Sequence, residues 1–351
     1  MPDTLSKLTY QTFQQGKNYF GLAHKILSTR LMSLVSPAQS QYKPISADLL
    51  LKIQQRLNQL LETDWQDAEQ GVYPQSLLFD NPWDEFFLYY PAVWLDLPQI
   101  WERAKQKQHQ DFPPEINTEG YPNYYVRNFH HQTGGYLSDF SAKLYDLQVE
   151  ILFGGTADPM RRRILAPLKQ GLQQFTNVLP HQVRILDVAC GTGRTLKLIR
   201  AALPEASLFG TDLSPAYLRK ANQLLSQNPG ELPQLLQANA EELPYLDNYF
   251  HATTCVFLFH ELPGPVRQKV IDQCFRVTQP GGVLVICDSI QVSDSPDMIP
   301  VMDSFHETFH EPFYKHYMTD DLVERLEKAG FENVTTQTHF MSKVFVAHKP
   351  A

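Results

Sequence analysis

Long apolar stretches are absent from this sequence of 351 residues. Its longest uninterrupted apolar runs, such as Cys255 to Phe259 and Val283 to Cys287, contain five residues each, whereas a membrane-spanning helix needs about 20. We therefore expect no transmembrane segment. The beginning of the chain also lacks the basic start, apolar stretch and small-residue cleavage site of a secretory signal, which favours a cytoplasmic location.

Cysteine and positive charge are both scarce. The four cysteines form no CxxC pair and lie among apolar neighbours, which predicts small buried side chains in a reducing compartment rather than disulfides or metal ligands. They are Cys190, Cys255, Cys274 and Cys287. Thirty Lys and Arg against 38 Asp and Glu give a net charge of −8. Because an acidic chain repels phosphate backbones, we expect no nucleic-acid partner.

The chain does contain enough apolar material for a folded core. Hydrophobic residues make up 43% of it and charged residues 19%, which is typical of globular proteins. At about 150 residues per domain, this length predicts one large domain plus a smaller one, or two comparable ones. Changes in composition along the sequence predict a helical, aromatic-rich cap over residues 1–155 and a second domain over residues 156–351.

Amphipathic helices are predicted at the start of the chain. The first 47 residues contain one acidic and five basic residues. Apolar residues recur there at helical spacing: Phe20, Ala23, Leu27, Leu31 and Leu34. We expect this helix to dock onto the protein itself, and peripheral contact with an anionic membrane surface is the alternative. A second helix is predicted from Ser46 to about Gly71.

Aromatic residues mixed with prolines fill residues 73–129, which predicts loops and short helices. Helices are then predicted over residues 138–153 and from near Pro159 towards Phe175. The latter contains three consecutive arginines, residues 161–163. We expect these arginines to form a solvated or salt-bridged helix face.

Beyond His181, short apolar or β-branched runs alternate with helical stretches. Helices are expected over residues 195–202, 216–225 and 266–277, and strands over residues 183–188, 207–210, 235–237, 252–257 and 283–287. This alternation predicts an α/β fold in which helices cover both faces of a parallel sheet.

A glycine turn, Gly191-Thr192-Gly193, follows the first of these strands. Glycines allow the backbone to approach a ligand closely, and the free amides at the start of a helix favour an anionic group. The second strand leads to Asp212, 19 residues after Gly193, where a carboxylate can accept hydrogen bonds from two ribose hydroxyls. The turn and the carboxylate together predict a nucleoside site.

Residues 183 to about 346 resemble a class I S-adenosylmethionine-dependent methyltransferase of the ubiquinone/menaquinone C-methyltransferase-like type. The resemblance is carried by residues 187–193, 210–214, 238–244 with 247–250, and 280–284. It implies a doubly wound, Rossmann-like, seven-stranded sheet that is mostly parallel, with the last strand antiparallel. Two departures are Ala189, in the first glycine position of the family's first motif, and Asn239, where an acidic residue is common.

The resemblance also implies S-adenosyl-L-methionine as the cofactor. Gly191 and Gly193 would hold its methionine part and Asp212 its ribose, while Leu213, Asn239 and Ala240 would border adenine. The complete set of expected cofactor-binding residues is Asp187, Ala189, Gly191, Thr192, Gly193, Asp212, Leu213, Asn239, Ala240 and Phe257. A dinucleotide-binding dehydrogenase is disfavoured, because Leu196 stands where the third glycine of G-x-G-x-x-G would be.

Candidate catalytic residues follow the fourth predicted strand. His260 is suited to proton removal near neutral pH, and we expect it and Glu261 at the edge of the sheet where ligands of such folds bind. Capping or packing at the strand end is the alternative. No N-P-P-Y-like sequence occurs here, which disfavours methylation of adenine N6 or of glutamine amides.

Residues 306–310 have the sequence His-Glu-Thr-Phe-His, which matches the H-E-x-x-H pattern of zinc peptidases. Their aromatic surroundings favour a wall of the substrate cavity. His306 is then a candidate substrate contact and His310 a candidate catalytic base, and we expect no metal. A zinc hydrolase is the alternative function.

Residues 124–136 combine aromatic and polar side chains with a Gly-Gly pair, as expected of a lid over an apolar pocket. Tyr125, Arg127, His130 and His131 are the candidate substrate contacts, and a contact between domains is the alternative. The sequence thus predicts methyl transfer to a small acceptor, aromatic or lipophilic in character. A protein that binds the cofactor without catalysis is a third alternative.

Overall fold

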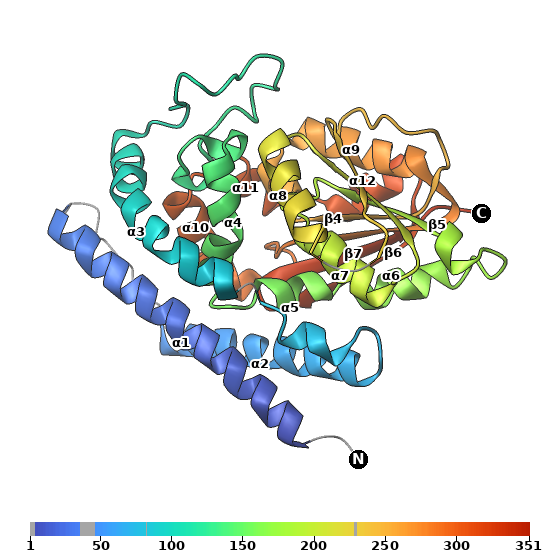
Figure 1. The fold of residues 1–351 in the computed structure, drawn as a ribbon, viewed down its shortest axis with the longest axis horizontal. Coiled ribbons are helices and arrows are strands. Elements are labelled where there is room, and N and C mark those ends of the chain that lie inside the picture. The colour runs from blue at the N-terminus through green and yellow to red at the C-terminus, as the bar shows by residue number, and fades with distance from the viewer. Residues whose placement is uncertain (1–3, 36–45, 82, 228–229) are drawn as a thin grey trace.

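The computed structural model describes residues 4–35, 46–81, 83–227 and 230–351. Its centre is a seven-stranded sheet in the order β3-β2-β1-β4-β5-β7-β6 (Figure 1). The strands are β1 Arg184–Val188, β2 Ser207–Asp212, β3 Gln234–Gln237, β4 Phe250–Val256, β5 Thr278–Ser289, β6 Glu332–His339 and β7 Ser342–His348. Only β7 runs antiparallel to its two neighbours, so the expected doubly wound α/β fold is confirmed.

Alternation along the strands divides the core between the two faces of the sheet. In β5, Val283 and Val285 join one cluster of buried side chains, and Leu284 and Ile286 join the other, because successive side chains in a strand point to opposite faces. Both faces are covered by helices, which is why these strands are almost continuously apolar. The covering helices are α6 Leu165–Leu172, α7 Arg194–Ala202, α8 Pro215–Leu225, α9 Gly264–Val277 and α12 Leu322–Ala329.

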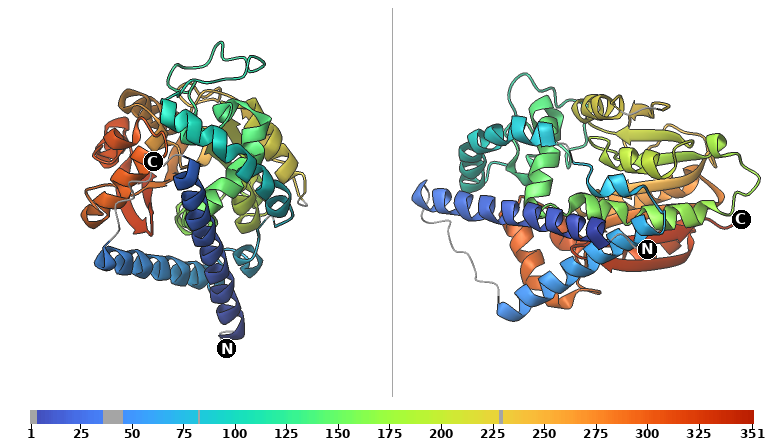
Figure 2. Two further views of the ribbon diagram at one scale, coloured as in Figure 1. Left: turned by 90° about the vertical axis from the view of Figure 1, so that its left-hand side faces the viewer. Right: turned by 60° about the horizontal axis from the view of Figure 1, so that its bottom comes forward.

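Further helices lie beside the sheet and beneath it (Figures 1 and 2). They are α1 Thr4–Val35, α2 Ala47–Glu69, α3 Trp83–Gln106, α4 Asp139–Leu152, α5 Ala157–Arg162, α10 Ile299–Thr308 and α11 Tyr314–Tyr317. The start of α2 agrees with the sequence prediction, since the Ser46 hydroxyl accepts a hydrogen bond from the Leu49 amide at 3.2 Å.

The prediction of loops and short helices over residues 73–129 is wrong for α3, which is a 24-residue helix with Pro91 and Pro98 inside it. Each internal proline removes a backbone hydrogen bond. The helix nevertheless packs against α4, where Val93 is buried with Leu144 and Leu147. Burial of this apolar contact outweighs the local cost of the prolines.

The docking of α1 onto the protein is confirmed, but the predicted face is wrong. Phe20, Leu27 and Leu31 are 47%, 52% and 39% exposed, Ala23 is exposed, and the side chain of Leu34 lies outside the described residues. The helix instead buries Tyr10, Gln14, Lys17, Gly21 and His24. This face is polar because α1 is held by hydrogen bonds and close backbone contact rather than by an apolar stripe.

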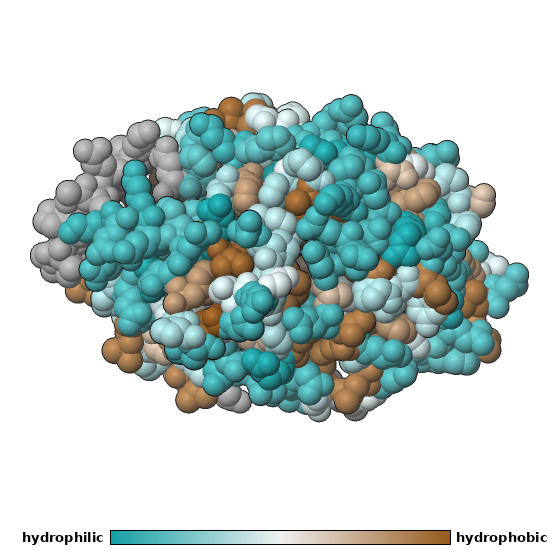
Figure 3. Space-filling model, turned by 90° about the horizontal axis from the view of Figure 1, so that it is seen from above, coloured by the Kyte–Doolittle hydropathy of each residue, from teal (hydrophilic) through white to brown (hydrophobic). Residues whose placement is uncertain are grey.

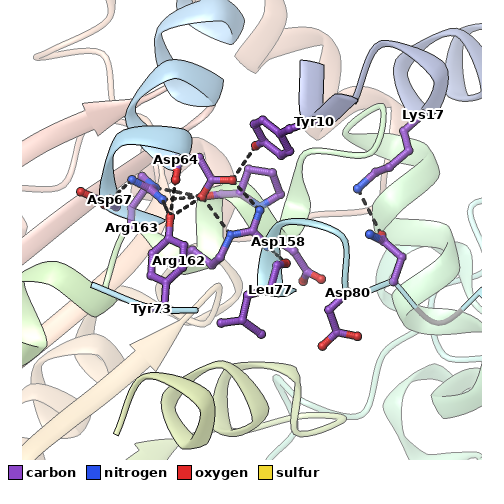
Figure 4. Close-up of polar contacts among 12 residues, drawn as sticks. Tyr10, Lys17, Asp64, Asp67, Tyr73, Leu77, Asp80, Asp158, Arg162 and Arg163 are labelled. Carbon is purple, nitrogen blue, oxygen red and sulfur yellow. Dashed lines mark hydrogen bonds and ion pairs between the residues drawn. The ribbon is translucent and has the colours of Figure 1, made fainter. Parts of the chain in front are cut away.

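The three consecutive arginines are Arg161 and Arg162, the last residues of α5, and Arg163, which caps it. They are salt-bridged, as expected, but they are buried rather than solvated. Figure 4 shows Arg162 and Arg163 converging on Asp64 of α2. Arg162 Nε and Nη2 donate to the two carboxylate oxygens of Asp64 at 2.9 and 2.5 Å, and Arg163 Nη2 donates at 2.5 Å. The Tyr10 hydroxyl of α1 adds a fourth hydrogen bond at 2.5 Å, so one carboxylate joins three helices.

The third arginine, Arg161, belongs to a neighbouring network. Asp158 accepts a hydrogen bond from Arg161 at 2.9 Å and a further one from Arg194, the first residue of α7. Arg161, Arg194 and Asp158 are all at most 5% exposed. This network fixes α5 against the helix that follows the first strand.

The surface is polar over most of the face seen from above in Figure 3, where hydrophobic residues form small patches among hydrophilic ones. In the described part of the chain, no helix has the length and apolar character to cross a bilayer. The expected absence of a transmembrane segment agrees with this finding for those residues.

We expect Asp64→Asn to lower the free energy of unfolding by about 3–5 kcal/mol, because it leaves the buried Arg162 guanidinium without a carboxylate and Arg163 with Asp67 alone. Burial alone would raise the pKa of Asp64, but Arg162 and Arg163 lower it from the usual 3.8 to about 2. The stabilisation is therefore present above pH 4 and is lost as the pH falls towards 2. Urea unfolding of both proteins between pH 2 and 7 measures the difference.

The matched control is Asp139→Asn, which breaks an ion pair with Arg219 whose side chains are 57% and 58% exposed. Such a pair contributes about 0–1 kcal/mol. Equal losses of unfolding free energy in the two variants would contradict the structural role of Asp64.

Candidate functional site

A cavity opens at the carboxyl ends of β1, β2 and β4, the edge at which parallel α/β sheets bind ligands. Eight of the expected cofactor-binding residues line it: Ala189, Gly191, Thr192, Asp212, Leu213, Asn239, Ala240 and Phe257. The structure therefore brings together segments that follow four different strands. Two of the expected residues, Asp187 and Gly193, are not among those that line the cavity.

The glycine turn is shaped by two left-handed residues with different roles. Gly191 has φ 54°, and a Cβ atom there would meet nothing within 4 Å, so its backbone is open to the cavity. Gly193 has φ 83° and caps α7. A Cβ atom on Gly193 would approach Ala221 Cβ to 3.0 Å, so this glycine is required for close packing of α7 and α8 and lies behind the cavity.

Asp212 is positioned by the backbone on either side of the cavity. Its two oxygens accept hydrogen bonds from the Gly191 amide at 2.9 Å and the Ser214 amide at 2.8 Å. Burial raises the pKa of Asp212 to about 6, although these amides act in the opposite direction. An ionised carboxylate has about four acceptor sites, so both oxygens can still accept hydrogen bonds from a ligand.

Asp187 lies beneath the cavity, inside β1, and is 1% exposed. It accepts a hydrogen bond from the Thr254 hydroxyl of β4 at 2.7 Å. Burial raises its pKa to about 7. This carboxyl group joins the two strands that carry the cavity floor.

Five tyrosines also line the cavity: Tyr124, Tyr125, Tyr136, Tyr145 and Tyr217. We call them the tyrosine wall. Tyr125 was expected here, whereas Tyr145 and Tyr217 were missed. Tyr217 lies in the first turn of α8, directly after Asp212-Leu213-Ser214, and this closeness to the second strand was an available signal. Tyr145 reaches the cavity because α4 packs on α8, which no local pattern indicates.

His260 and Glu261 differ in their access to the cavity. Glu261 lines it and accepts a hydrogen bond from the Tyr136 hydroxyl at 2.5 Å. His260 is buried behind it, with Nδ1 2.7 Å from Asp288 Oδ1. Burial alone would lower the pKa of His260, but Asp288 raises it to about 9. At neutral pH this imidazole carries both protons and is a donor.

His130 extends towards two carboxylates. Its Nε2 lies 3.0 Å from Glu311 Oε1 and 3.6 Å from Glu261 Oε1. Burial opposes protonation, but the two carboxylates raise the pKa of His130 to about 10. Both His130 and His131 have positive φ, 52° and 57°, which is costly for side chains other than glycine. This backbone directs consecutive rings into two different clusters.

His131 and His310 belong to the second cluster, with His109. The rings of His109 and His310 stack with centroids 3.6 Å apart, and His131 Nε2 accepts a hydrogen bond from the His310 amide at 3.4 Å. Burial lowers the pKa of His131 to about 4 and that of His310 to about 3. These rings are neutral at pH 7 and make packing contacts near the cavity.

The two histidines of the H-E-x-x-H pattern do not share a helix face. Helix α10 ends at Thr308, before His310. His306 contacts its own helix, with Nδ1 2.9 Å from the Asp303 carbonyl. The geometry of a zinc peptidase, in which both imidazoles project from one helix, is not formed by these two residues.

Arg127 lies at the rim of the tyrosine wall. Its guanidinium is 5.9 Å from the ring centroid of Phe313, a cation–π arrangement. Neither Arg127 nor His306 lines the cavity. Of the candidate substrate contacts, only Tyr125 lines it directly.

Two charged residues that the sequence did not suggest for this site complete it. Arg161 lines the cavity with its guanidinium 5.8 Å from the Phe257 ring centroid. Glu311 is 2% exposed, and burial raises its pKa. Arg161 belongs to the run of three arginines and Glu311 directly follows His310, but neither pattern indicated a position beside this cavity.

Comparison with known proteins agrees with this geometry. A family model described as a methyltransferase domain matches residues 185–282. The demethylmenaquinone methyltransferase of Geobacillus stearothermophilus is 33% identical over 109 residues, which cover 31% of this chain and 46% of that protein. The arsenite methyltransferase of Halobacterium salinarum is 28% identical over 166 residues, 46% of this chain and 41% of that protein. The chain thus spans less than half the length of these relatives.

Among solved structures, phosphoethanolamine N-methyltransferase 2 of Haemonchus contortus in complex with S-adenosyl-L-methionine is 14% identical, with a TM-score of 0.39. The similarity covers 52% of this chain and 53% of that one.

Proposed function

Because the chain carries a class I S-adenosylmethionine-dependent methyltransferase domain of the ubiquinone/menaquinone C-methyltransferase-like type, we propose that it methylates a small aromatic or lipophilic acceptor. Residues 156–351 serve as the cofactor-binding domain and residues 1–155 as the cap. The observation that carries the proposal is one cavity lined by Asp212, the glycine turn and the tyrosine wall. The cofactor supplies an electrophilic methyl group when it is bound.

Different residues of the cavity bind different parts of the cofactor. Asp212 accepts hydrogen bonds from the ribose hydroxyls, and Gly191 leaves space for the methionine part. Leu213, Asn239 and Ala240 border adenine, and Asn239 is held by a hydrogen bond from the Glu241 amide to its side-chain oxygen at 3.0 Å. Most of the rate comes from holding the acceptor in line with the methyl group, since alignment alone lowers such barriers by several kcal/mol.

Proton transfer involves Glu261 more directly than His260. Glu261 faces the cavity and can accept a proton from an acceptor hydroxyl, whereas His260 is already protonated and paired with Asp288. His260 therefore acts as a positioning residue that keeps positive charge behind Glu261, with its Nε2 4.0 Å from Glu261 Oε1. His131 and His310 hold the wall of the cavity.

The acceptor is aromatic or lipophilic, because the tyrosine wall offers large flat surfaces. The hydroxyls of Tyr124, Tyr136 and Tyr217 are already hydrogen-bonded within the protein. The name of one relative, demethylmenaquinone methyltransferase, supports this class, and arsenite is the contrasting acceptor named in another. A zinc hydrolase has no support in the geometry of residues 306–310. The protein acts in the cytoplasm, which its four buried, unpaired cysteines support.

We infer that the outer side of helix α1, away from the face that docks on the protein, also makes peripheral contact with an anionic membrane surface, from which a lipophilic acceptor is supplied. Its outer side carries Leu5, Leu8, Tyr19, Leu22 and Ile26, which are 47–73% exposed. We expect the protein to co-sediment with phosphatidylserine vesicles, and a Leu22→Glu/Ile26→Glu variant to do so several-fold less, because buried apolar area drives such binding. Equal sedimentation of the two proteins would contradict the contact.

Cofactor affinity should depend on the ionisation of Asp212. With a pKa of about 6, the carboxylate that binds ribose is lost on acidification, so the Kd of S-adenosyl-L-methionine is expected to rise about tenfold from pH 7 to pH 5. Isothermal titration calorimetry measures it. Asp212→Asn should bind at least tenfold more weakly at pH 7 and show no such dependence; an unchanged affinity in this variant would exclude the assignment.

The acceptor class is tested with radiolabelled S-adenosyl-L-methionine and two acceptors, reduced demethylmenaquinone and arsenite. We expect transfer to the former only. Tyr125→Ala should raise the KM for that acceptor at least several-fold while cofactor affinity stays within about threefold. Transfer to arsenite at a comparable rate, or an unaltered KM in the variant, would count against an aromatic acceptor site.

A further inference from the structure

Three side chains beside the cavity converge on one point. His130 Nε2 and one carboxylate oxygen each from Glu261 and Glu311 all lie within 4.8 Å of one another. His130 Nε2 lies 3.0 Å from the Glu311 carboxylate and 3.6 Å from the Glu261 carboxylate. They come from three distant parts of the chain, so the arrangement is a product of the fold and not of a local turn.

The Glu311 carboxylate contacts His130 but has no hydrogen-bond partner among the described residues. Its side chain is 0% exposed, and neither of its oxygens makes a hydrogen bond within the described structure. A buried ionised carboxylate normally has several hydrogen bonds or a full counter-charge. Two carboxylates and one imidazole thus lie close together, and the Glu311 oxygens are left without a hydrogen bond from the rest of the described chain.

The geometry and chemistry of the three groups match the needs of a metal ion. With bonds of about 2.0–2.2 Å, ligand atoms of a tetrahedral or octahedral ion lie about 3.0–3.4 Å apart at adjacent positions, close to the two distances from His130 Nε2. One imidazole and two carboxylates form a donor set that suits divalent Mn, Fe or Zn better than Ca²⁺. The hydrogen bond from Tyr136 to Glu261 orients one of these ligands, as second-sphere groups do in metal sites.

We propose that His130, Glu261 and Glu311 bind one divalent transition-metal ion at the edge of the cavity. The site uses neither His306 nor His310, so it is distinct from the zinc pattern considered in the sequence. Because Glu261 also lines the cavity, the ion lies where the acceptor would bind. Resting on the proposed function, this position selects acceptors that carry an oxygen donor, such as a phenolic hydroxyl.

The test measures metal binding to the full-length protein with neither cofactor nor acceptor present, so that its outcome is independent of methyl transfer. Mn²⁺ is titrated and the free ion is followed by electron paramagnetic resonance, with Zn²⁺ as competitor. We expect saturable binding of one Mn²⁺ per chain that Zn²⁺ displaces. Glu311→Gln and Glu261→Gln should each weaken it at least tenfold, because each removes an anionic ligand.

Glu327→Gln, an exposed glutamate of α12, is the matched control and should bind as the parent does. Urea unfolding shows whether each variant is folded. Because two ligand variants are made, the test still holds if one of them does not fold. Absence of saturable binding of both Mn²⁺ and Zn²⁺ to the parent would overturn the proposal. Undiminished binding in the folded ligand variants would overturn it equally.

Discussion

The arrangement of the molecule depends on a short helix that buries three consecutive arginines beneath the sheet. A buried guanidinium is tolerated only when carboxylates and hydrogen bonds replace its water, so the partners of residues 161–163 must come to α5. Asp64 brings α2 and, through Tyr10, α1. Asp158 connects α5 with the first residue of α7. The position of the cap relative to the glycine turn therefore follows from charge pairing together with an apolar interface, in which Trp65 and Leu78 belong to the same buried cluster as Leu165 of α6.

At the cavity, by contrast, two carboxyl groups of the described chain lack partners of opposite charge. Asp187 is buried and Asp212 half-buried, and neither forms a salt bridge within the described residues. Their pKa values are raised to about 7 and about 6. Groups shifted in this direction stabilise the fold at low pH and cease to do so as the pH rises through their folded pKa values. At neutral pH the site is thus held in an unfavourable electrostatic state by the rest of the structure. A ligand that donates hydrogen bonds to Asp212 relieves part of that cost. At this residue the protein therefore has a lower free energy of unfolding and a stronger preference for such a ligand.

Local patterns predicted the parts of the fold that local physics determines. The alternation of short apolar runs with helical stretches indicated all five parallel strands, and Ser46 indicated the start of α2. The glycine turn and Asp212 indicated part of the lining of the cavity. The failures share a cause, because tertiary contacts override local preference: α3 continues through Pro91 and Pro98 by packing on α4, and α1 docks through a polar face that a hydrophobic pattern cannot indicate. Glu311, Tyr145 and Arg161 reach the site only through the packing of distant elements, so their roles had no signal in the sequence.

The site residues that the sequence predicted and those that it missed lie mostly in different parts of the chain. The matched family model ends at residue 282 and begins at residue 185, and within it lie the glycine turn, Asp212 and Asn239. Four of the five tyrosines of the wall, together with His130 and Glu311, lie outside that range. The tyrosine wall and the cluster beside it are thus built mostly by segments that the family model does not cover. The names of two relatives differ in their methyl acceptor, demethylmenaquinone and arsenite. We therefore infer the acceptor of this protein from its own tyrosine wall and the three charged groups beside it.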